Sequence, residues 1–449
     1  MKDLLWFCRT SDSSSLARIT DSVVPLLKSK FNITLLSNKT NIEGINHITM
    51  GADTKSVKYI DFLRTMPGAF KNGKVNDENI RCINMKYILV QLVDLIYDGN
   101  YDYLLICNGV YEIDWITKIL TSNPKYLTNK DSKKTKLVVW APIDYIPSIG
   151  VIQNVIKADK FLTMTPVMKT EIEKCLTDNQ FTTTCQLDWV GHGSDISGRS
   201  DISGRLTQQL PREQLVKKLN QMHSDKLIMS KHLFTIDDII ILNANNYGPL
   251  DSKLDSIENT PGTRKRLDIT VKAFLKVLEN NDNKKVKLWI HTNLKSFFEM
   301  LAIENILLPT FIDNIILSNN SLTNDQLELV YQMSNISIQT STGEGWSLTN
   351  LEASMNRSLQ VVPDFLACGY HFKNRGILIP VTRKTIKNEG GIDVVIGEVS
   401  VEDTTAKIHE ALKILDNKQE LDAILDKAYN YANSYTWLSV ANKITEILN

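Results

Sequence analysis

Two carboxylates close together in the sequence, Glu344 and Glu352, follow a short apolar run that ends at Gln339. Gly343 and Gly345 flank the first of them, and the composition after Trp346 is that of a helix start. Backbone amides in the first turn of a helix lack intrahelical partners and can bind a diphosphate. Carboxylates accept hydrogen bonds from the hydroxyls of a sugar. The pattern therefore predicts a site for a diphosphate and for hydroxyl groups beside it.

A simpler interpretation of Glu352 needs no ligand. Thr349 and Glu352 have the Thr-x-x-Glu spacing of a capping box, in which the two side chains satisfy amides at the start of a helix. Upstream, Thr323 and Gln326 have the related Thr-x-x-Gln spacing, and apolar residues follow at helical intervals. We therefore expect a helix after Thr323, a strand over Ile336 to Gln339, and a second helix that begins near Ser347 to Thr349.

A basic segment forms the second candidate group. The apolar run from Asp238 to Asn243 predicts a buried strand, and the helix-like segment that follows contains Arg264, Lys265 and Arg266 near its start. Cations that face a departing diphosphate stabilise the negative charge that develops on it. The alternative is that Arg264 and Arg266 are merely solvated charges at a helix start.

The stretch from Glu344 to Glu352, with the strand-like Gln360 to Asp364 after it, resembles the E-x7-E signature of retaining family 4 glycosyltransferases. The resemblance implies that Glu344 approaches the donor sugar, that Glu352 holds the ribose and that Lys265 is the family's lysine. At the family's usual arginine position this chain has Asn246, so Arg264 or Arg266 is expected to replace that arginine. The donor-binding residues that the resemblance implies are Gly343, Gly345, Trp346, Ser347, Leu348, Thr349, Glu352, Asn245 and Asn246.

The first half of the chain supplies weaker candidates. Asp144 ends the strand-like Leu137 to Trp140 region, where it can meet the acceptor or the sugar, or else belong to a proline-containing turn. His192 lies in Trp189-Val-Gly-His-Gly, which resembles the family's "HGVD" turn, and it is either a site residue or a turn residue. The loop from Thr10 to Ser15 replaces the family's glycine-rich loop and can contact the substrate or cap a helix from Leu16. The expected catalytic group is thus Glu344, Lys265, Arg264, Asp144 and His192.

Buried strands that alternate with amphipathic helices must position these residues. The expected strands are Leu4 to Cys8, Ile33 to Leu36, Tyr103 to Cys107, Leu137 to Trp140, Phe161 to Met164, Asp238 to Asn243, Val286 to His291, Asn314 to Leu317, Ile336 to Gln339 and Ile377 to Pro380. Helices are expected at Ser15 to Leu27 and Met85 to Tyr97. This βαβ alternation predicts two doubly wound α/β domains.

The resemblance implies the GT-B fold, in which two Rossmann-like domains face a central cleft. We expect an N-terminal acceptor domain over 1–210, a C-terminal donor domain over 211–425, and a helix over 426–449 that returns to the N-terminal domain. The amphipathic segment Ala428 to Leu448 matches that last helix. Residues 194–231 are polar and contain a tandem hexapeptide, so we interpret them as a surface insertion near the linker. Tyr247 to Gly262 is a second expected loop.

Composition narrows the classes of protein. The 51 Lys and Arg residues balance 51 Asp and Glu residues, so a nucleic-acid partner, which needs a basic face, is not expected. No apolar run is long enough to cross a membrane, and the amino terminus is not a signal peptide. The six scattered cysteines predict neither a disulfide framework nor a zinc site. We expect a cytoplasmic protein, with peripheral attachment to a membrane as an alternative.

The resemblance implies a retaining transfer of a sugar from a UDP- or GDP-sugar to a hydroxyl acceptor, either a glycan or another glycoconjugate. The sequence contains no D-x-D motif, so neither a metal nor another cofactor is expected. Two alternatives remain open. One is a phosphorylase or sugar-nucleotide epimerase on the same architecture. The other is a weakly active or inactive sugar-nucleotide-binding or scaffold protein. This alternative arises because the chain has Asn246 where the family has arginine.

Overall fold

The computed structural model describes residues 1–8, 15–37, 42–50, 70–71, 74–75, 77–193, 209–245, 264–279, 285–306, 312–319, 321–387 and 391–449. Several sequence predictions lie outside the described residues. These are Asn246, the tandem hexapeptide, the expected loop Tyr247 to Gly262 and the loop from Thr10 up to the start of the first helix.

The first half of the chain is built on a seven-stranded parallel sheet of order β10-β9-β7-β6-β1-β2-β3. Its strands are β1 (Lys2–Cys8), β2 (Phe31–Ser37), β3 (Asn46–Thr49), β6 (Tyr103–Cys107), β7 (Lys136–Ala141), β9 (Lys160–Thr163) and β10 (Gln186–Trp189). The accompanying helices are α1 (Ser15–Leu27), α3 (Asp77–Asp98), α4 (Val110–Ser122), α5 (Ile149–Ile152) and α6 (Pro166–Asp178). A two-stranded hairpin, β4 (Phe70–Lys71) and β5 (Lys74–Val75), precedes α3.

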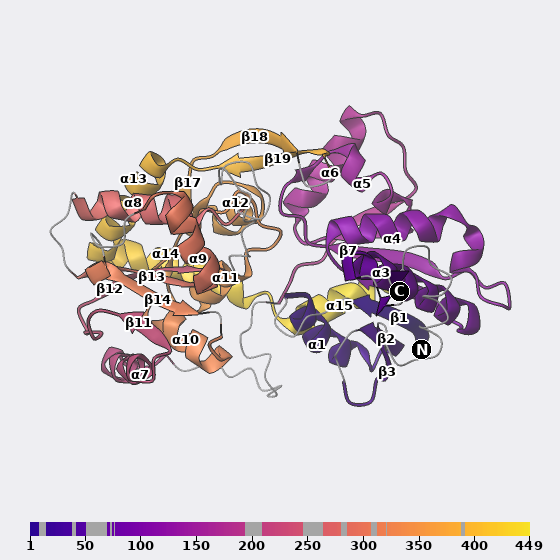
Figure 1. Cartoon of the computed structure of the whole chain (residues 1–449), viewed down its shortest axis with the longest axis horizontal. Coiled ribbons are helices and arrows are strands. Elements are labelled where there is room, and N and C mark those ends of the chain that lie inside the picture. Colours follow the sequence, from indigo (N-terminus) through magenta and orange to yellow (C-terminus); the bar gives the residue numbers. More distant parts are fainter. Residues whose placement is uncertain are drawn as a thin grey trace.

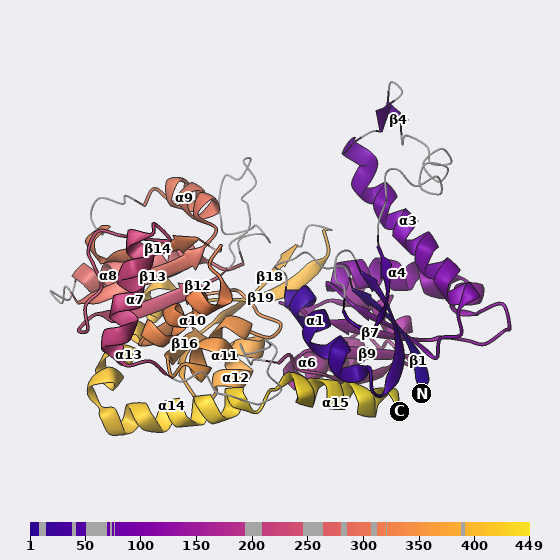
Figure 2. The ribbon, with the colours of Figure 1, turned by 90° about the horizontal axis from the view of Figure 1, so that it is seen from below.

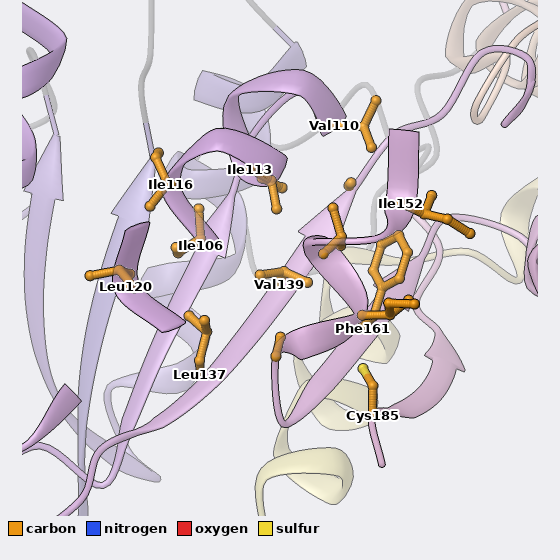
Figure 3. Packing of buried hydrophobic residues seen from close by; sticks show 14 of the residues in the cluster. Ile106, Val110, Ile113, Ile116, Leu120, Leu137, Val139, Ile152, Phe161 and Cys185 are labelled. Atoms are coloured by element: carbon orange, nitrogen blue, oxygen red, sulfur yellow. The ribbon is translucent and has the colours of Figure 1, made fainter. Parts of the chain in front are cut away.

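Packing of α4 on this sheet explains why its strands are continuous apolar runs. Val110, Ile113, Ile116 and Leu120 recur at helical spacing and point at β6 and β7 (Figure 3). All five residues of β6 are buried, because its side chains alternate between two covered faces. One face belongs to this cluster, and the other belongs to a second cluster with α1 and the last helix.

The second half is built on another seven-stranded sheet, of order β11-β14-β13-β12-β15-β16-β17, in which β11 alone runs antiparallel to its neighbour. Its strands are β11 (Ile228–Ser230), β12 (Ile239–Ala244), β13 (Val286–Thr292), β14 (Ile315–Asn319), β15 (Ile336–Ile338), β16 (Leu359–Pro363) and β17 (Ile377–Ile379). Its helices are α7 (Arg212–Ser224), α8 (Leu267–Glu279), α9 (Leu294–Ile303), α10 (Asn324–Met333), α11 (Leu348–Met355), α12 (Leu366–Phe372), α13 (Val401–Asp416) and α14 (Lys418–Asn433).

The strand order of each sheet reverses at one point. In the first sheet the chain builds outward from β1 in one direction and from β6 in the other, and in the second sheet the same happens at β12 and β15. Ligands of open parallel sheets bind outside the carboxyl ends of the strands at such a switch point. The ends of β12 and β15 are therefore the place where this fold favours a ligand, and the two candidate groups of the second half follow these two strands.

Two elements connect the halves. The hairpin of β18 (Thr382–Lys387) and β19 (Asp393–Glu398) extends from the second half, and β19 pairs with β8 (Ile146–Pro147) of the first half (Figure 1). On another side, α14 leads into α15 (Trp437–Leu448), which lies under the first half near the amino terminus (Figure 2). Trp437, Val440 and Ile444 of α15 are buried in the cluster that contains β1 and α1.

The prediction of two doubly wound domains and a returning C-terminal helix is confirmed, although the amphipathic segment breaks between α14 and α15. The domain limits at residues 210 and 425 stay predictions. The interpretation of residues 194–231 as a surface insertion was wrong for its second part, because residues 212–224 form α7 and residues 228–230 form β11, whereas residues 194–208 lie outside the described ranges. Leu215, Leu219 and Met222 on one side of α7 are buried. Within the described ranges, no helix combines the length and hydropathy needed to cross a membrane.

Candidate functional site

The loop between β15 and α11, residues 339–347, carries the first glutamate and is called the glutamate loop below. It ends at Ser347, whose backbone is left-handed with φ 62° and ψ 48°. The helix begins at Leu348, as predicted, and the Ser347 side chain does not cap it. The Ser347 hydroxyl instead bonds the Asn350 side chain at 2.9 Å. The first-turn amides of α11 thus receive no cap from this residue.

Glu344 is the centre of a charged cluster. Its Oε1 accepts hydrogen bonds from Lys265 Nζ and, at 2.8 Å, from Gln339 Nε2. Arg264 Nη1 lies 3.1 Å from the same oxygen and also donates to the carbonyl of Gly343 at 3.0 Å. Two strand ends are responsible for this arrangement, because Gln339 follows β15 while Arg264 and Lys265 precede α8, which follows the neighbouring strand β12.

The cations decide the protonation state of Glu344. Burial alone would raise the pKa of this carboxyl, since only 7% of the residue is exposed, but Arg264 and Lys265 hold its pKa at about 2. Burial and the neighbouring Arg264 lower the pKa of Lys265, while Glu344 opposes that change. At neutral pH the cluster is therefore a buried carboxylate that accepts hydrogen bonds beside two cations.

Asp144 brings the first half of the chain to this cluster. Its Oδ1 accepts a hydrogen bond from the Gly345 amide at 2.8 Å, and its Oδ2 lies 3.3 Å from Arg264 Nη2. A Cβ on Gly343 would lie 1.8 Å from the Asp144 carbonyl oxygen, and one on Gly345 would lie 3.0 Å from the Ile143 amide nitrogen. Glycine at position 343 is therefore required by the approach of the two loops and not by its own backbone angles.

Glu352 has partners of its own. Its Oε1 accepts a hydrogen bond from Arg18 of α1, and its Oε2 accepts one from the Tyr331 hydroxyl of α10 at 3.0 Å. Because α11 starts at Leu348, Thr349 lies inside the helix and not at its cap. The interpretation of Thr349 and Glu352 as a capping box is wrong. The upstream box is confirmed, since Thr323 and Gln326 make both of its hydrogen bonds.

Arg264 and Arg266 differ in their surroundings. Arg264 faces Glu344 and Asp144. The Arg266 guanidinium instead makes a bidentate pair with Asp268, in which Nε and Nη2 each donate to a carboxylate oxygen at 3.0 Å. The third guanidinium nitrogen of Arg266, Nη1, lies 3.6 Å from Glu398 Oε1. Arg266 is 8% exposed, and Arg264 pairs with Glu344 and Asp144, so neither arginine is merely a solvated surface charge. Arg266 holds the turn that presents Arg264 and Lys265.

The remaining predicted residues lie outside the Glu344 cluster. The His192 ring packs against Trp437 at 4.5 Å between centroids, and its Nδ1 lies 2.6 Å from the Gly193 carbonyl oxygen. Trp346 is buried against Gly191, where an added Cβ would lie 2.5 Å from its ring. The Asn245 amide donates to Asn243 at the end of β12. Leu348 packs against the core that contains α1 and α15.

Three polar residues of this region were absent from the predicted site. Gln339 bonds Glu344, and Arg18 and Tyr331 bond Glu352. The sequence could have indicated Gln339, because it ends a strand next to the loop. No sequence pattern could have indicated that Arg18 pairs with a residue in the other half. In the described part of the chain no three His, Cys, Asp or Glu side chains gather as metal ligands would. A surface pocket of about 350 Å³ lined by Lys160 and Lys443 lies where β9 and β10 begin, away from this cluster.

Comparison with solved structures identifies the fold. The chain superposes on the α,α-trehalose 6-phosphate synthase of Burkholderia multivorans with a TM-score of 0.65 at 13% identity, covering 100% of this chain and 96% of that one. The sucrose-phosphate synthase of Thermosynechococcus elongatus gives 0.63 at 9% identity, covering 99% and 98%. Anabaena HepE, solved in complex with UDP and glucose, gives 0.62 at 10% identity, covering 100% and 99%. These proteins are similar to this chain over its whole length, and the chain has the GT-B fold.

No family model matches the sequence. No curated protein matches it either.

Proposed function

We propose that this protein is a retaining glycosyltransferase of the family 4 type, which moves a sugar from a UDP- or GDP-sugar to a hydroxyl of a glycan or other glycoconjugate. The observation that carries the proposal is the cluster of Arg264, Lys265 and Glu344 at the switch point of the second sheet. It combines a carboxylate for sugar hydroxyls with two cations for a diphosphate. The fold is that of nucleotide-sugar-dependent enzymes, and the cluster lies where such a fold favours a ligand.

The donor is proposed to lie along the glutamate loop. Glu344 accepts hydrogen bonds from the donor sugar, and the first-turn amides of α11, together with Gly345, bind the phosphates. Glu352 holds the ribose, and its bonds to Arg18 and Tyr331 fix the orientation of its carboxylate. Asn245 and the segment from Trp346 to Thr349 complete the donor contacts, either directly or by shaping the loop.

The chemistry follows from the charges. As the bond between the sugar and the diphosphate breaks, negative charge develops on the leaving phosphate, and Lys265 and Arg264 stabilise it by several kcal/mol in a buried site. The acceptor hydroxyl enters on the face that the phosphate leaves, and its proton passes to a phosphate oxygen. Asp144 contacts the acceptor or the sugar from the first half. His192 contributes through the loop it shares with Gly191. Because two side chains supply the positive charge, the proposed reaction needs no metal.

UDP is the first donor nucleotide to test. Anabaena HepE, a structural neighbour, was solved with UDP and glucose. A ligand that binds the folded state raises the unfolding temperature, so UDP-, GDP- and ADP-sugars can be compared by thermal shift. We expect a shift with a UDP- or GDP-sugar that Lys265→Ala abolishes. Mass spectrometry of acceptor mixtures then detects transfer. If saturating sugar nucleotides leave the unfolding temperature unchanged, the proposal fails.

A second candidate function is binding of a sugar nucleotide without transfer. The observation in its favour is that Asp144 already pairs with Arg264 and with the Gly345 amide, which are groups the proposed donor would use. Calorimetry distinguishes the two functions. A binding protein releases heat with the nucleotide sugar but yields neither a glycosylated product nor free nucleoside diphosphate with any acceptor.

A further inference from the structure

We propose that the β18–β19 hairpin is a positioning strap, which holds the Asp144 loop of the first half against the glutamate loop of the second half and stays docked during turnover. This inference rests on the proposed function. It concerns how the two halves of the site are kept in register. In Figure 1 the hairpin spans the upper side of the molecule from the second half toward α6 of the first half.

The far end of the strap is docked into the first half. β19 runs antiparallel to β8, with Val394 opposite Pro147 and Val395 opposite Ile146. Val394 is only 3% exposed and belongs to the same apolar cluster as β6, β7 and α4. Beside it, Ile392 lies so close to Gly150 that a Cβ there would be 2.9 Å from the Ile392 side chain. The far end of the hairpin therefore packs on the first half's core, although its sequence belongs to the second half.

The near end of the strap is bonded to the glutamate loop. The Gly397 amide donates to the Thr342 carbonyl at 2.8 Å, and the Thr342 amide donates to the Arg264 carbonyl, also at 2.8 Å. Glu398 lies 3.6 Å from the Arg266 guanidinium. One strand thus contacts both segments that form the charged cluster, the glutamate loop and the basic turn.

These contacts close a ring. Starting at Asp144, the chain reaches β8 after one residue, β8 pairs with β19, and β19 bonds Thr342 through Gly397. Thr342 lies two residues before Glu344, and Arg264 returns to Asp144. Two links of this ring, the β8–β19 pairing and the Gly397–Thr342 bond, are backbone contacts, and they fix relative positions more firmly than the Arg264–Asp144 ion pair alone, because a solvent-accessible ion pair contributes little. Asp144 is therefore held by the strap as well as by its own side-chain contacts.

The strap acts through Asp144 and makes none of the described contacts to Glu344 or Lys265 itself. If its far end undocks, the donor site of the second half stays intact, while the Asp144 loop loses its register. A misplacement on the order of 1 Å can reduce a rate by about 100-fold. We therefore expect loss of transfer without loss of donor binding, and a larger share of donor hydrolysis, because water can enter a loosened contact.

The first test places a charge under the strap. Val394→Asp inserts a carboxylate into the first core, and Thr385→Asp places the same charge on an exposed position of the same hairpin as the matched control. We expect Val394→Asp to lower kcat for transfer about 10- to 100-fold, to change the donor KM less than about threefold and to raise the hydrolysis-to-transfer ratio. Val394→Ile keeps an apolar side chain at this position and should keep wild-type transfer. Should Val394→Asp fail to fold, Val394→Thr applies the same test with a milder polar group.

The second test fastens the strap. Opposite residues of an antiparallel pair have Cα atoms about 4.5–5.5 Å apart, within the range that a disulfide spans. Ile146→Cys with Val395→Cys should therefore oxidise to a disulfide that keeps wild-type transfer activity. If oxidation abolishes transfer and a reductant restores it, the strap must open during turnover and the proposal is overturned.

The outcomes separate this inference from the proposed function. A wild-type protein that binds no nucleotide sugar refutes the function. A wild-type protein that transfers sugar while Val394→Asp matches Thr385→Asp in kcat, donor KM and hydrolysis refutes the strap alone.

Discussion

Replacement of Glu344 by glutamine tests the electrostatics of the site directly. The substitution keeps the size of the side chain and one acceptor oxygen, but it removes the charge that Lys265 and Arg264 share. Only 7% of Glu344 is exposed, so little solvent is present to replace the lost pairing. A buried cation that loses its partner destabilises a protein far more than a broken surface pair does.

The magnitude follows from the pKa. The two cations hold the pKa of Glu344 at about 2, against an ordinary 4.5. At about 1.36 kcal/mol per unit this difference corresponds to about 3 kcal/mol of folding free energy. Because the folded-state pKa is depressed, this stability is fully present above pH 4.5 and is lost as the pH falls from 4.5 through 2. Lys265 can shed its proton more readily in the variant, so about 3 kcal/mol is the upper end of the expected loss.

The assay is urea unfolding at a series of pH values for the wild type and for Glu344→Gln. The difference in unfolding free energy should approach about 3 kcal/mol at pH 7 and shrink below pH 4.5. Glu402→Gln is the matched control, since Glu402 pairs with Lys276 on the surface with a side chain 73% exposed, and its loss should be unmeasurable. The reasoning is refuted if Glu344→Gln is as stable as the wild type at pH 7, or if its deficit does not vary with pH.

Three further predictions follow from the same contacts. Lys265→Met removes a cation that we propose faces the leaving phosphate, so kcat should fall about 100-fold in steady-state kinetics; a fall below threefold would contradict its role. Asp144→Asn removes the carboxylate that competes for Arg264 and the Gly345 amide, so calorimetry should show UDP binding a few-fold tighter, whereas weaker binding would make Asp144 a donor ligand. Arg18→Gln leaves the buried Glu352 without its cation, so the unfolding temperature should fall by several degrees; an unchanged temperature would mean that the pair contributes nothing.

Much of the fold was predictable because its strands are buried on both faces. The run Tyr103 to Cys107 and the helix Ser15 to Leu27 have the limits that were predicted. Continuous apolar runs predict buried strands, and apolar residues at helical spacing predict helices, wherever an element packs mainly against its neighbours in the sequence. The same logic placed the capping box at Thr323 and the start of α11.

In the polar segment 194–231, polar residues hide the apolar pattern that predicts a helix. In α7 the buried positions Leu215, Leu219 and Met222 recur at helical spacing, but polar and charged residues fill nearly all of the rest of the helix. Overall polarity predicted a surface insertion, and only the periodicity would have predicted a helix. Its one apolar face packs with β11 in a small cluster on the second sheet.

In the candidate site, residues grouped closely in the sequence could be singled out, whereas contacts between residues far apart in the chain could not. Glu344 and Lys265 could be singled out because each sits in a motif of residues close in sequence. The pairing of Glu352 with Arg18 joins residues far apart in the chain, and no local pattern encodes it. The strands β18 and β19 were also missed. Every residue from Thr382 to Lys387 except Ile386 is polar and most of them are exposed, and the second partner strand of β19 comes from the other half.

Part of the contact between the halves involves backbone groups, and a sequence motif does not reveal that part. The Asp144 carboxylate accepts a hydrogen bond from the backbone amide of Gly345, and β19 pairs with β8 through main-chain groups. Every non-proline residue carries such a donor and acceptor, so the pairing leaves no compositional trace. Its only trace is the small residues that make room for it, and Gly343, against which the Asp144 carbonyl packs, is the clearest. Gly343, next to Glu344, therefore indicates a second surface at the same place, and that surface is the Asp144 loop, which we propose the strap holds.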